Sequence, residues 1–405
     1  MWHREPVTIY IDPPAWPAHG RLWSHLISDV SLDELHGFAA RQGVPRRGFE
    51  RDHYDVPAEA HDRLVAAGAV PVSSREIVAR LSETGLRRRK AVAPARRAVG
   101  NALLRPRRLV VGDTVGVVAT SGVVPEDRLR AGLSRLSSWG LQARVGPHVL
   151  GRHPSVSYLA ACDEDRAADF AAAWNDPDVA AVWVARGGYG AQRMVDLLDW
   201  RRLAEAAPKV LVGFSDVTAL HQAIATRLGL VTVHGHVVTS LGAATEASAE
   251  QLHRVVMAPA AVDLLAGQDT TTLVGGTSTG VLIGGNLAVL AAEVGTPFSR
   301  PATGGIAVLE EIGEEPYRVD RLLTQLIRAG WFSGVAGIVV GAFTDCGDPD
   351  EVDRLVEQRL APLEVPLVRG FDVGHTHSSA AVPLGVAATL DADRRSLELA
   401  VPPLV

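Results

Sequence analysis

Lys209-Val210-Leu211-Val212-Gly213-Phe214-Ser215-Asp216-Val217-Thr218-Ala219-Leu220 sets the pattern for the longer part of the chain. Its apolar, β-branched run at 210–212 predicts a short buried strand, and apolar residues recur with helical period from Asp216 onwards. Ser215 therefore lies at a strand-to-helix turn, where a hydroxyl can be exposed at the edge of a sheet. Serines exposed in this way usually have glycine two residues later, and here Val217 takes that place. On spacing alone, the favoured interpretation is that Ser215 caps the following helix.

The composition indicates a soluble globular protein of two or three domains. The 405 residues are 47% hydrophobic and 21% charged, with a formal net charge of -6, which gives no general reason to expect nucleic-acid binding. Cys162 and Cys346 lack the spacing of a disulfide framework or a thiolate zinc site. The chain begins without an apolar signal segment, and no apolar run is long enough to cross a membrane. These features predict a cytoplasmic protein without membrane or nucleic-acid partners.

Residues 1–86 are predicted to form a small appended α/β domain. A strand is expected at 7–11 and helices at 31–41, 58–67 and 74–81, the first of them capped by Ser31 with Glu34 in a capping box. The domain is rich in histidine and has aspartates nearby, so that a metal site is conceivable: His19, His25, His36, His53, His61, Asp52 and Asp55. Because no two histidines have the i, i+4 spacing of a helical metal motif, surface or core histidines are favoured and no metal is predicted.

Residues 87–108 carry arginine and lysine without a single acidic residue, and alanine, proline and valine fill the gaps. A basic run could bind nucleic acid or acidic lipid. No aromatic residue is interleaved with the charges, which favours a solvated linker and a domain boundary. We therefore expect an α/β domain at 109–260 that carries the Ser215 turn and a smaller, β-rich domain at 261–405.

From residue 109 onwards, apolar runs alternate with amphipathic helices, which is typical of a parallel sheet covered on both faces. Strands are expected at 115–119, 143–145, 179–184, 210–212 and 231–233, and helices at 126–139, 164–174 and 192–198. Beyond residue 260, strands are expected at 306–309, 335–340 and 367–369, helices at 286–292 and 318–329, and a hairpin at 386–390 and 397–401. The glycine loop at 187–190 follows a strand and could present backbone N–H groups to a ligand, but it lacks the spacing of a nucleotide-binding loop.

Five motifs occur in one order along the chain. They are Arg186-Gly187-Gly188-Tyr189-Gly190, Gly213-Phe214-Ser215-Asp216, Gly284-Gly285-Asn286-Leu287, Leu309-Glu310-Glu311 with Pro316-Tyr317-Arg318, and Gly374-His375 with Pro383-Leu384-Gly385. Together they resemble the LD-carboxypeptidase family of serine peptidases, which includes the microcin C immunity peptidases, over residues 109–401. The segments at 16–26 and 51–57 resemble a small family of unknown function.

The resemblance implies a Ser-Glu-His triad of Ser215, Glu310 and His375. It also implies an oxyanion hole made by the backbone N–H groups of Gly188 and Asp216. Substrate contacts are expected from Tyr189, Asn286 and Arg318. By the same resemblance, the enzyme would be a homodimer that hydrolyses an L,D amide bond of a small muropeptide without metal or cofactor, releasing D-alanine from murein tetrapeptides in cell-wall recycling.

Several residues depart from the family pattern or admit two roles. Glu311 stands beside the predicted triad acid, and on a strand only one of the two should face the site. His236 replaces a common proline, and His377 is a competing base. Arg318 could hold a substrate carboxylate or form a salt bridge at a helix N-terminus. A microcin-type peptidase acting on a peptidyl-nucleotide and a non-catalytic binding protein are the alternative functions.

Overall fold

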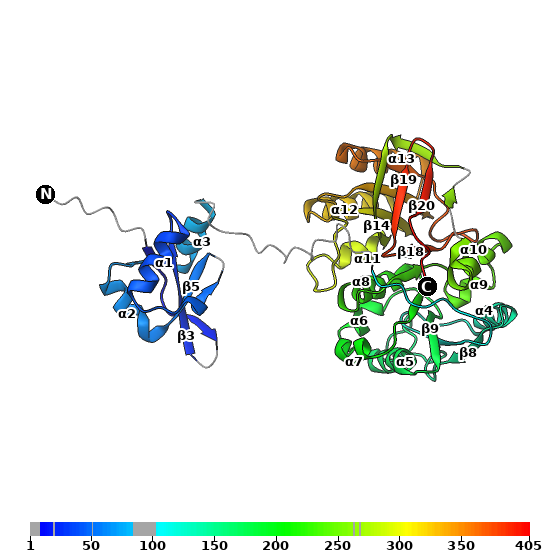
Figure 1. The fold of residues 1–405 in the computed structure, drawn as a ribbon, viewed down its shortest axis with the longest axis horizontal. Coiled ribbons are helices and arrows are strands. Elements are labelled where there is room, and N and C mark those ends of the chain that lie inside the picture. The colour runs from blue at the N-terminus through cyan, green and yellow to red at the C-terminus, as the bar shows by residue number, and fades with distance from the viewer. Residues whose placement is uncertain (1–8, 19–20, 51, 84–102, 262–263, 267–268) are drawn as a thin grey trace. The chain divides into compact units, whose positions relative to one another are not determined.

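The computed structural model describes residues 9–18, 21–50, 52–83, 103–261, 264–266 and 269–405. The chain divides into two compact units, one up to Arg96 and one from Arg97 to Val405 (Figure 1). Most of the expected linker, residues 87–102, lies outside the described residues, as do residues 7 and 8 of the first expected strand and His19.

The first unit is a small sheet with helices packed on it. The strand order is β4-β5-β3-β1-β6, and β2 pairs with β3. The elements are β1 (Ile9–Ile11), β2 (Trp16–Ala18), β3 (Arg21–Ser28), α1 (Leu32–Arg41), β4 (Phe49–Glu50), β5 (His53–Pro57), α2 (Ala58–Ala66), β6 (Val70–Pro71) and α3 (Ser74–Glu83). The Ser31 hydroxyl accepts from the Glu34 N–H at 3.2 Å, which confirms the predicted cap of α1.

Alternation along β3 divides this unit into two apolar clusters. Leu26 lies in the main core with residues of α1 and α2, among them Leu35 and Leu64. Its neighbour Ile27 packs on the opposite face against Ile77 and Leu81 of α3. Because side chains two residues apart on a strand share a face, His25 lies on the same face as Ile27.

The second unit begins with a sheet of order β18-β11-β10-β9-β7-β8, to which the distant segment Val382–Leu384 contributes β18. All pairs are parallel except β18 with β11. Its elements up to residue 261 are β7 (Thr114–Val118), α4 (Glu126–Ser138), β8 (Gln142–Val145), α5 (Asp163–Asn175), β9 (Val179–Val184), α6 (Ala191–Val195), α7 (Trp200–Glu205), β10 (Val210–Gly213), the 3-10 helix η2 (Ser215–Val217), α8 (Thr218–Arg227), β11 (Thr232–His234), α9 (Val238–Leu241) and α10 (Glu246–Met257). Both faces are covered by helices, since β9 gives Trp183 to a core with α4 and α10 and Val182 to a core with α5 and α8. The predicted α/β class is confirmed.

The second sheet of this unit has the order β12-β20-β19-β14-β15-β16-β17-β13, with a parallel centre from β14 to β17. Its strands and the helices between them are β12 (Leu264–Ala266), β13 (Thr271–Val274), β14 (Thr277–Asn286), α11 (Leu287–Ala292), β15 (Gly305–Ile312), α12 (Pro316–Arg328), β16 (Gly337–Thr344), α13 (Pro349–Leu360), β17 (Leu367–Arg369), β19 (Ala387–Asp391) and β20 (Ser396–Leu399). Helices α11, α12 and α13 pack on one face. On the opposite face, side chains of β14 to β17 pack against side chains of the β19–β20 hairpin.

Two features of the second unit differ from the boundaries expected from sequence. Strand β18 lies in the region assigned to the smaller domain, yet it pairs with β11 and completes the first sheet. Residues 103 and 104 also contact the second unit, because the Leu103 N–H donates to the Gly385 carbonyl and the Leu104 N–H to the Gly229 carbonyl. Residues 103–108 therefore belong to the second unit and are not part of a solvated linker.

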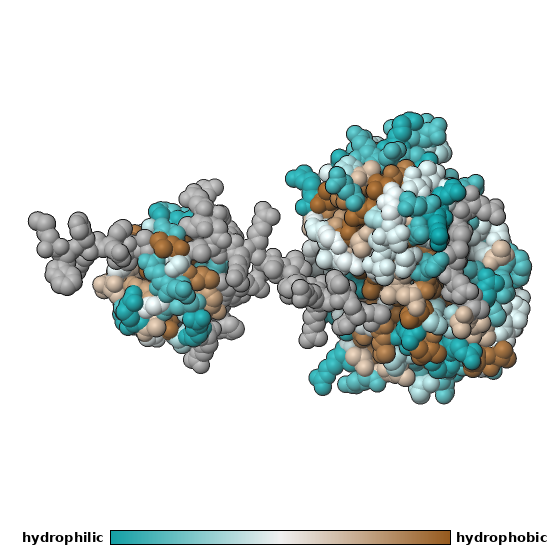
Figure 2. All heavy atoms as spheres, turned by 45° about the horizontal axis from the view of Figure 1, so that its top comes forward, coloured by the Kyte–Doolittle hydropathy of each residue, from teal (hydrophilic) through white to brown (hydrophobic). Residues whose placement is uncertain are grey.

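The surface seen in Figure 2 interleaves hydrophilic and hydrophobic residues on both units. Among the described residues, no helix has the length and apolar character needed to cross a membrane.

Candidate active site

Ser215 occupies a strained turn directly after β10. Its backbone φ is 67°, in the left-handed region that a residue with a side chain rarely adopts. The hydroxyl does not cap a helix: Phe214 is the N-cap residue of η2 and Val217 that of α8, neither with a side-chain cap bond. The helix-cap interpretation of Ser215 was wrong, because the hydroxyl lies beside His375 Nε2 and makes no cap bond to a helix.

Val217 fits this turn because glycine occurs two residues before Ser215, at Gly213, instead of two residues after it. A Cβ atom at Gly213 would lie 3.0 Å from a Val217 methyl and 3.2 Å from Val184. Gly213 thus provides the space into which Val217 packs. The absence of glycine two residues after Ser215 is therefore compatible with an exposed serine.

Three polar side chains from distant parts of the chain form a continuous hydrogen-bonded row. His375 Nε2 lies 2.9 Å from Ser215 Oγ, and His375 Nδ1 lies 2.7 Å from Glu310 Oε2. Glu310 comes from β15, where the pairing with β16 shifts register between Leu309 and Glu311. Gly374 allows the close approach, since a Cβ atom there would lie 2.9 Å from Glu310 Oε2. The hydroxyl, imidazole and carboxylate have the arrangement of a nucleophile, a base and the group that orients the base.

Glu310 is completely buried and remains charged. Burial by itself would raise its pKa, but the nearby His234 and His375 rings outweigh this effect and hold the pKa at about 2. His234 Nε2 lies 3.7 Å from Glu310 Oε1, which is too long for a hydrogen bond. No role of His234 was predicted from the sequence. Its position at the end of β11, beside the end of β10, is the signal that could have identified it.

Glu311 faces away from the triad row. Its carboxylate accepts hydrogen bonds from the Asn286 side-chain amide at 2.8 Å, the Ala288 N–H at 2.7 Å and the Ile312 N–H at 2.9 Å. Burial raises its pKa to about 7, with the Glu310 charge acting in the same direction, even though these three donors favour the carboxylate. The two adjacent glutamates thus differ in environment, as expected for successive residues on a strand.

The glycine loop at 187–190 lies against Ser215. A Cβ atom at Gly187 would be 2.9 Å from Ser215 Cβ and 3.1 Å from its Oγ. The buried Asp216 carboxylate connects the serine turn with this loop, since Oδ2 accepts from the Ser121 hydroxyl at 2.6 Å and from the Ala191 N–H at 2.7 Å. Gly188 has φ 113°, so glycine is needed for the loop conformation. These contacts therefore fix the position of the glycine loop relative to the serine turn.

The three residues expected to contact substrate differ in exposure and in hydrogen-bond or ion-pair partners. Tyr189 is 48% exposed, and its ring lies 6.0 Å from that of Tyr158. Arg318 pairs with Glu314 at 3.5 Å at the start of α12, as in the salt-bridge interpretation. Asn286 is buried: its side-chain oxygen caps α11 by accepting from Val289, and its amide donates to Glu311. The side chain of Asn286 is thus engaged within the protein.

The two histidines left open by the sequence lie outside the triad row. His236 is buried and its ring nitrogens lie 3.1 Å from the Ser240 hydroxyl and 2.9 Å from the Ser248 hydroxyl. Burial lowers the pKa of His236 to about 4, so that its ring is neutral at neutral pH. The described hydrogen bond of His377 uses its backbone carbonyl, which accepts from the Thr245 N–H. His375 is the histidine next to Ser215.

Comparisons with known proteins show the family to which the larger part of the chain belongs. Residues 115–235 match the LD-carboxypeptidase N-terminal domain and residues 279–390 the LD-carboxypeptidase C-terminal domain, whereas residues 9–84 match a family of proteins of unknown function (DUF4031). A putative carboxypeptidase of Streptomyces coelicolor is 52% identical over 304 residues, covering 75% of this chain and 98% of the relative. The murein tetrapeptide carboxypeptidase of Pseudomonas aeruginosa is 38% identical, covering 69% of this chain and 94% of the relative.

A solved structure supports the fold. The crystal structure of an MccF-like protein from Bacillus anthracis has a TM-score of 0.66 at 24% identity, covering 73% of this chain and 99% of that one. Both domains of the family match, and the matches to the two relatives cover nearly the full length of each relative. The chain therefore belongs to the LD-carboxypeptidase family of serine peptidases.

Proposed function

We propose that this protein is a serine carboxypeptidase that hydrolyses an L,D amide bond and releases D-alanine from murein tetrapeptides. The observation that carries the proposal is the row from Ser215 Oγ to His375 Nε2 at 2.9 Å and from His375 Nδ1 to Glu310 Oε2 at 2.7 Å. The choice of substrate is supported by the relative from Pseudomonas aeruginosa, whose name is murein tetrapeptide carboxypeptidase.

In the first half of the reaction, Ser215 Oγ attacks the carbonyl carbon of the amide while His375 Nε2 takes the hydroxyl proton. Glu310 accepts the Nδ1–H hydrogen bond, which fixes the tautomer and stabilises the imidazolium. A pKa of about 2 keeps Glu310 a carboxylate at neutral pH, as this role requires. His375 then gives its proton to the leaving nitrogen, the C–N bond breaks, and an ester remains on Ser215.

In the second half, a water molecule attacks the ester carbonyl and His375 takes a proton from that water. The C–O bond to Ser215 breaks, and the serine oxygen recovers the proton from His375. The shortened peptide leaves with a new carboxylate. Each proton taken by the histidine is thus returned within the cycle.

The developing oxyanion is assigned to the backbone N–H groups of Asp216 and Gly188. The position of Asp216 directly after Ser215 in η2 supports this assignment, because the first backbone N–H groups of a helix have no carbonyl partner within it. The contact of the glycine loop with Ser215 brings the neighbouring residue Gly188 into the same region. Within the described part of the chain, no hydrogen bond from the Gly188 N–H to another protein group is found.

The test is to incubate the protein with a murein tetrapeptide and to measure D-alanine by mass spectrometry. We expect release from the L,D bond and none from the same peptide with an L-residue in last position. Cleavage of the L,L peptide alone would contradict the proposal. Cleavage only of a peptidyl-nucleotide would support a microcin-type peptidase, and no cleavage of any of these would support a binding protein. The homodimer and the cytoplasmic location stay predictions.

A further inference from the structure

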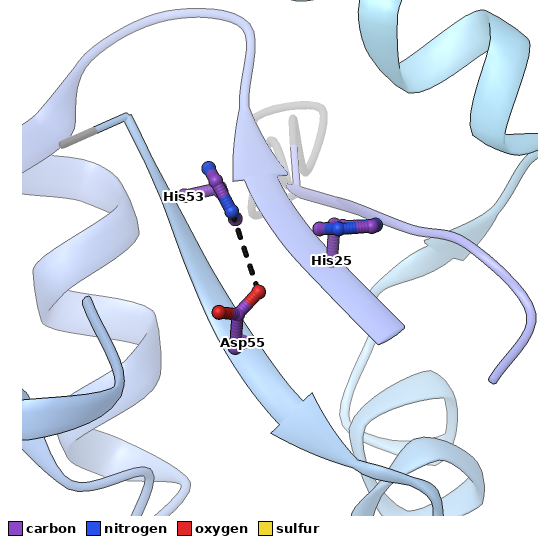
Figure 3. A group of neighbouring side chains, drawn as sticks. All are labelled: His25, His53 and Asp55. Carbon is purple, nitrogen blue, oxygen red and sulfur yellow. Dashed lines mark ion pairs between the residues drawn. The ribbon is translucent and has the colours of Figure 1, made fainter. Parts of the chain in front are cut away.

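A cluster of histidine and aspartate side chains lies on the first unit, outside the peptidase site. His25, His53 and Asp55 each offer one potential ligand atom, and these atoms all lie within 4.8 Å of one another. Figure 3 shows the three side chains on adjacent strands, with a dashed line for the ion pair between His53 and Asp55. It is the one such group of three found among the described residues.

Strand pairing brings the three residues together. Strands β3 and β5 are antiparallel, and His25 is the register partner of Asp55. His53 is two residues from Asp55 on β5, so that its side chain points to the same face of the sheet. The intervening Tyr54 and the next residue, Val56, are buried in the core on the opposite face. The core therefore fixes the register and, with it, the separation of the three polar side chains.

A carboxylate lies at hydrogen-bond distance from the Nδ1 atom of each histidine. His25 Nδ1 lies 2.9 Å from Asp12 Oδ2, and His53 Nδ1 lies 2.6 Å from Asp52 Oδ1. Asp12 is buried and also accepts from the Ser74 hydroxyl at 2.6 Å, which fixes it against the start of α3. Metal-binding histidines usually donate their other ring nitrogen to a carboxylate, which orients the ring and increases its basicity. Both histidines of the cluster have this support.

One ligand pair has the separation found around a small cation, and the three ligand atoms together lie within 4.8 Å of one another. At metal–ligand distances of about 2.0–2.1 Å, two ligands of a tetrahedral ion are about 3.3 Å apart. His53 Nε2 and Asp55 Oδ1 are separated by 3.3 Å. The carboxylates of Asp12, Asp52 and Asp55 lie next to the two imidazole rings, and their negative charge favours a cation between the ligands.

We propose that His25, His53 and Asp55 bind one divalent transition-metal ion of the Zn²⁺ type. Two imidazoles and one carboxylate suit such ions, whereas Ca²⁺ and Mg²⁺ prefer ligand sets made of oxygen. Three protein ligands leave a tetrahedral ion one position for water or another molecule. The ligand side chains are 22% to 39% exposed, so that the ion can be reached from solvent. This site is distinct from the proposed peptidase reaction.

The chain also offers a matched control. His61 on α2 has its Nδ1 at 3.1 Å from Asp62 Oδ1, which is the same histidine–carboxylate pair as in the cluster. It does not belong to a group of three potential ligands among the described residues. Loss of His61 should therefore leave metal binding unchanged.

The experiment measures Zn²⁺ bound to the chelator-treated full chain by equilibrium dialysis and elemental analysis. We expect one Zn²⁺ per chain that is lost in His53→Ala and in Asp55→Asn and kept in His61→Ala. Asp52→Asn should weaken binding by about 10- to 100-fold, as removal of such a partner typically does. Circular dichroism of each variant distinguishes loss of the site from loss of the fold, and Asp55→Asn preserves the shape of the side chain.

Absence of Zn²⁺ binding by the wild-type chain at micromolar concentration would overturn the proposal. Unchanged stoichiometry in the His25→Ala/His53→Ala double variant would do the same, since it would locate the ion elsewhere. Binding of Ca²⁺ or Mg²⁺ in preference to Zn²⁺ would contradict the assigned ion class. D-alanine release should be the same in His53→Ala and the wild type, so that failure of this proposal and failure of the peptidase proposal can be told apart.

Discussion

His375 in the second unit and His25 in the first unit each have a buried carboxylate beside Nδ1, but the groups around the rest of the ring differ. His375 Nδ1 lies 2.7 Å from Glu310, and His25 Nδ1 lies 2.9 Å from Asp12, with both carboxylates almost completely buried. On its other side, His375 faces the hydroxyl of Ser215 on a strained turn. His25 instead belongs to a group with a second histidine and the carboxylate of Asp55.

The comparison shows that a histidine–carboxylate pair does not by itself determine a function. The buried carboxylate fixes the ring and its tautomer in both units. The third group then decides the chemistry, because a hydroxyl at hydrogen-bond distance makes the ring a base, whereas further ligand atoms at metal-binding distance make it a ligand.

The largest effect is expected from Ser215→Ala. Removal of the nucleophile should lower kcat for D-alanine release by about 10⁴-fold or more and leave the fold intact, because the hydroxyl contributes little to packing. Zn²⁺ binding by the full chain should be unchanged in this variant. A Ser215→Ala protein with more than a tenth of wild-type turnover would show that another residue is the nucleophile.

The next effect concerns the two adjacent glutamates. Glu310→Gln should lower kcat by about 10⁴-fold, because an amide can stabilise the wrong tautomer of the base. Glu311→Gln is the matched control and should cost less than about tenfold, since its carboxylate bonds to Asn286 and backbone N–H groups instead of His375. Steady-state kinetics on the tetrapeptide measures both. If Glu311→Gln were the more damaging change, the orientation of β15 would be wrong.

The same two residues should give opposite pH dependence of stability. The pKa of Glu310 is lowered to about 2, so its contribution is present above the unfolded value near 4.5 and is lost as pH falls towards 2. The pKa of Glu311 is raised to about 7, so that the folded state binds the extra proton and stability falls as pH rises from about 4.5 to 7. Each contribution is on the order of 3 kcal/mol at most.

Denaturant unfolding of the wild type and the two variants across pH 3–8 measures these contributions. Glu310→Gln should flatten the acid side of the stability profile, and Glu311→Gln should flatten the decline towards pH 7. Glutamine keeps the size of each side chain, so that packing changes little. Identical profiles for the two variants would show that the environments of the two glutamates do not differ as described.

The smallest effect on hydrolysis is expected from removing the first unit. A fragment that begins at Leu103 should hydrolyse the tetrapeptide within about twofold of the full chain and should not bind the Zn²⁺ ion. A fragment that begins at Leu109 is the comparison, and it should unfold at lower temperature because it lacks the hydrogen bonds of Leu103 and Leu104 with Gly385 and Gly229. Loss of hydrolysis in the longer fragment would mean that the first unit contributes to the peptidase site.

Local patterns predicted much of the architecture. The helix at 31–41 was expected from its cap and capping-box residues, and α1 spans Leu32–Arg41. The strand at 179–184 was expected from its apolar run, and β9 spans Val179–Val184. Such elements are predictable because period and capping act between residues a few positions apart. The edge strand β18 was not predicted, because its partner β11 is distant in sequence.

What the sequence determined by itself is therefore the order of the elements, the α/β class and the motifs that carry the family resemblance, since these depend on local period and residue type. The family resemblance named Ser215, Glu310 and His375, but only the tertiary structure gives the distances between them and the way in which Glu310, and not Glu311, faces His375 on β15. Without the resemblance, local spacing favoured a helix cap for Ser215. In the first unit, the pairing of β3 with β5 placed His25 opposite Asp55. Contacts of this kind arise from strand pairing between distant segments, which no local pattern specifies.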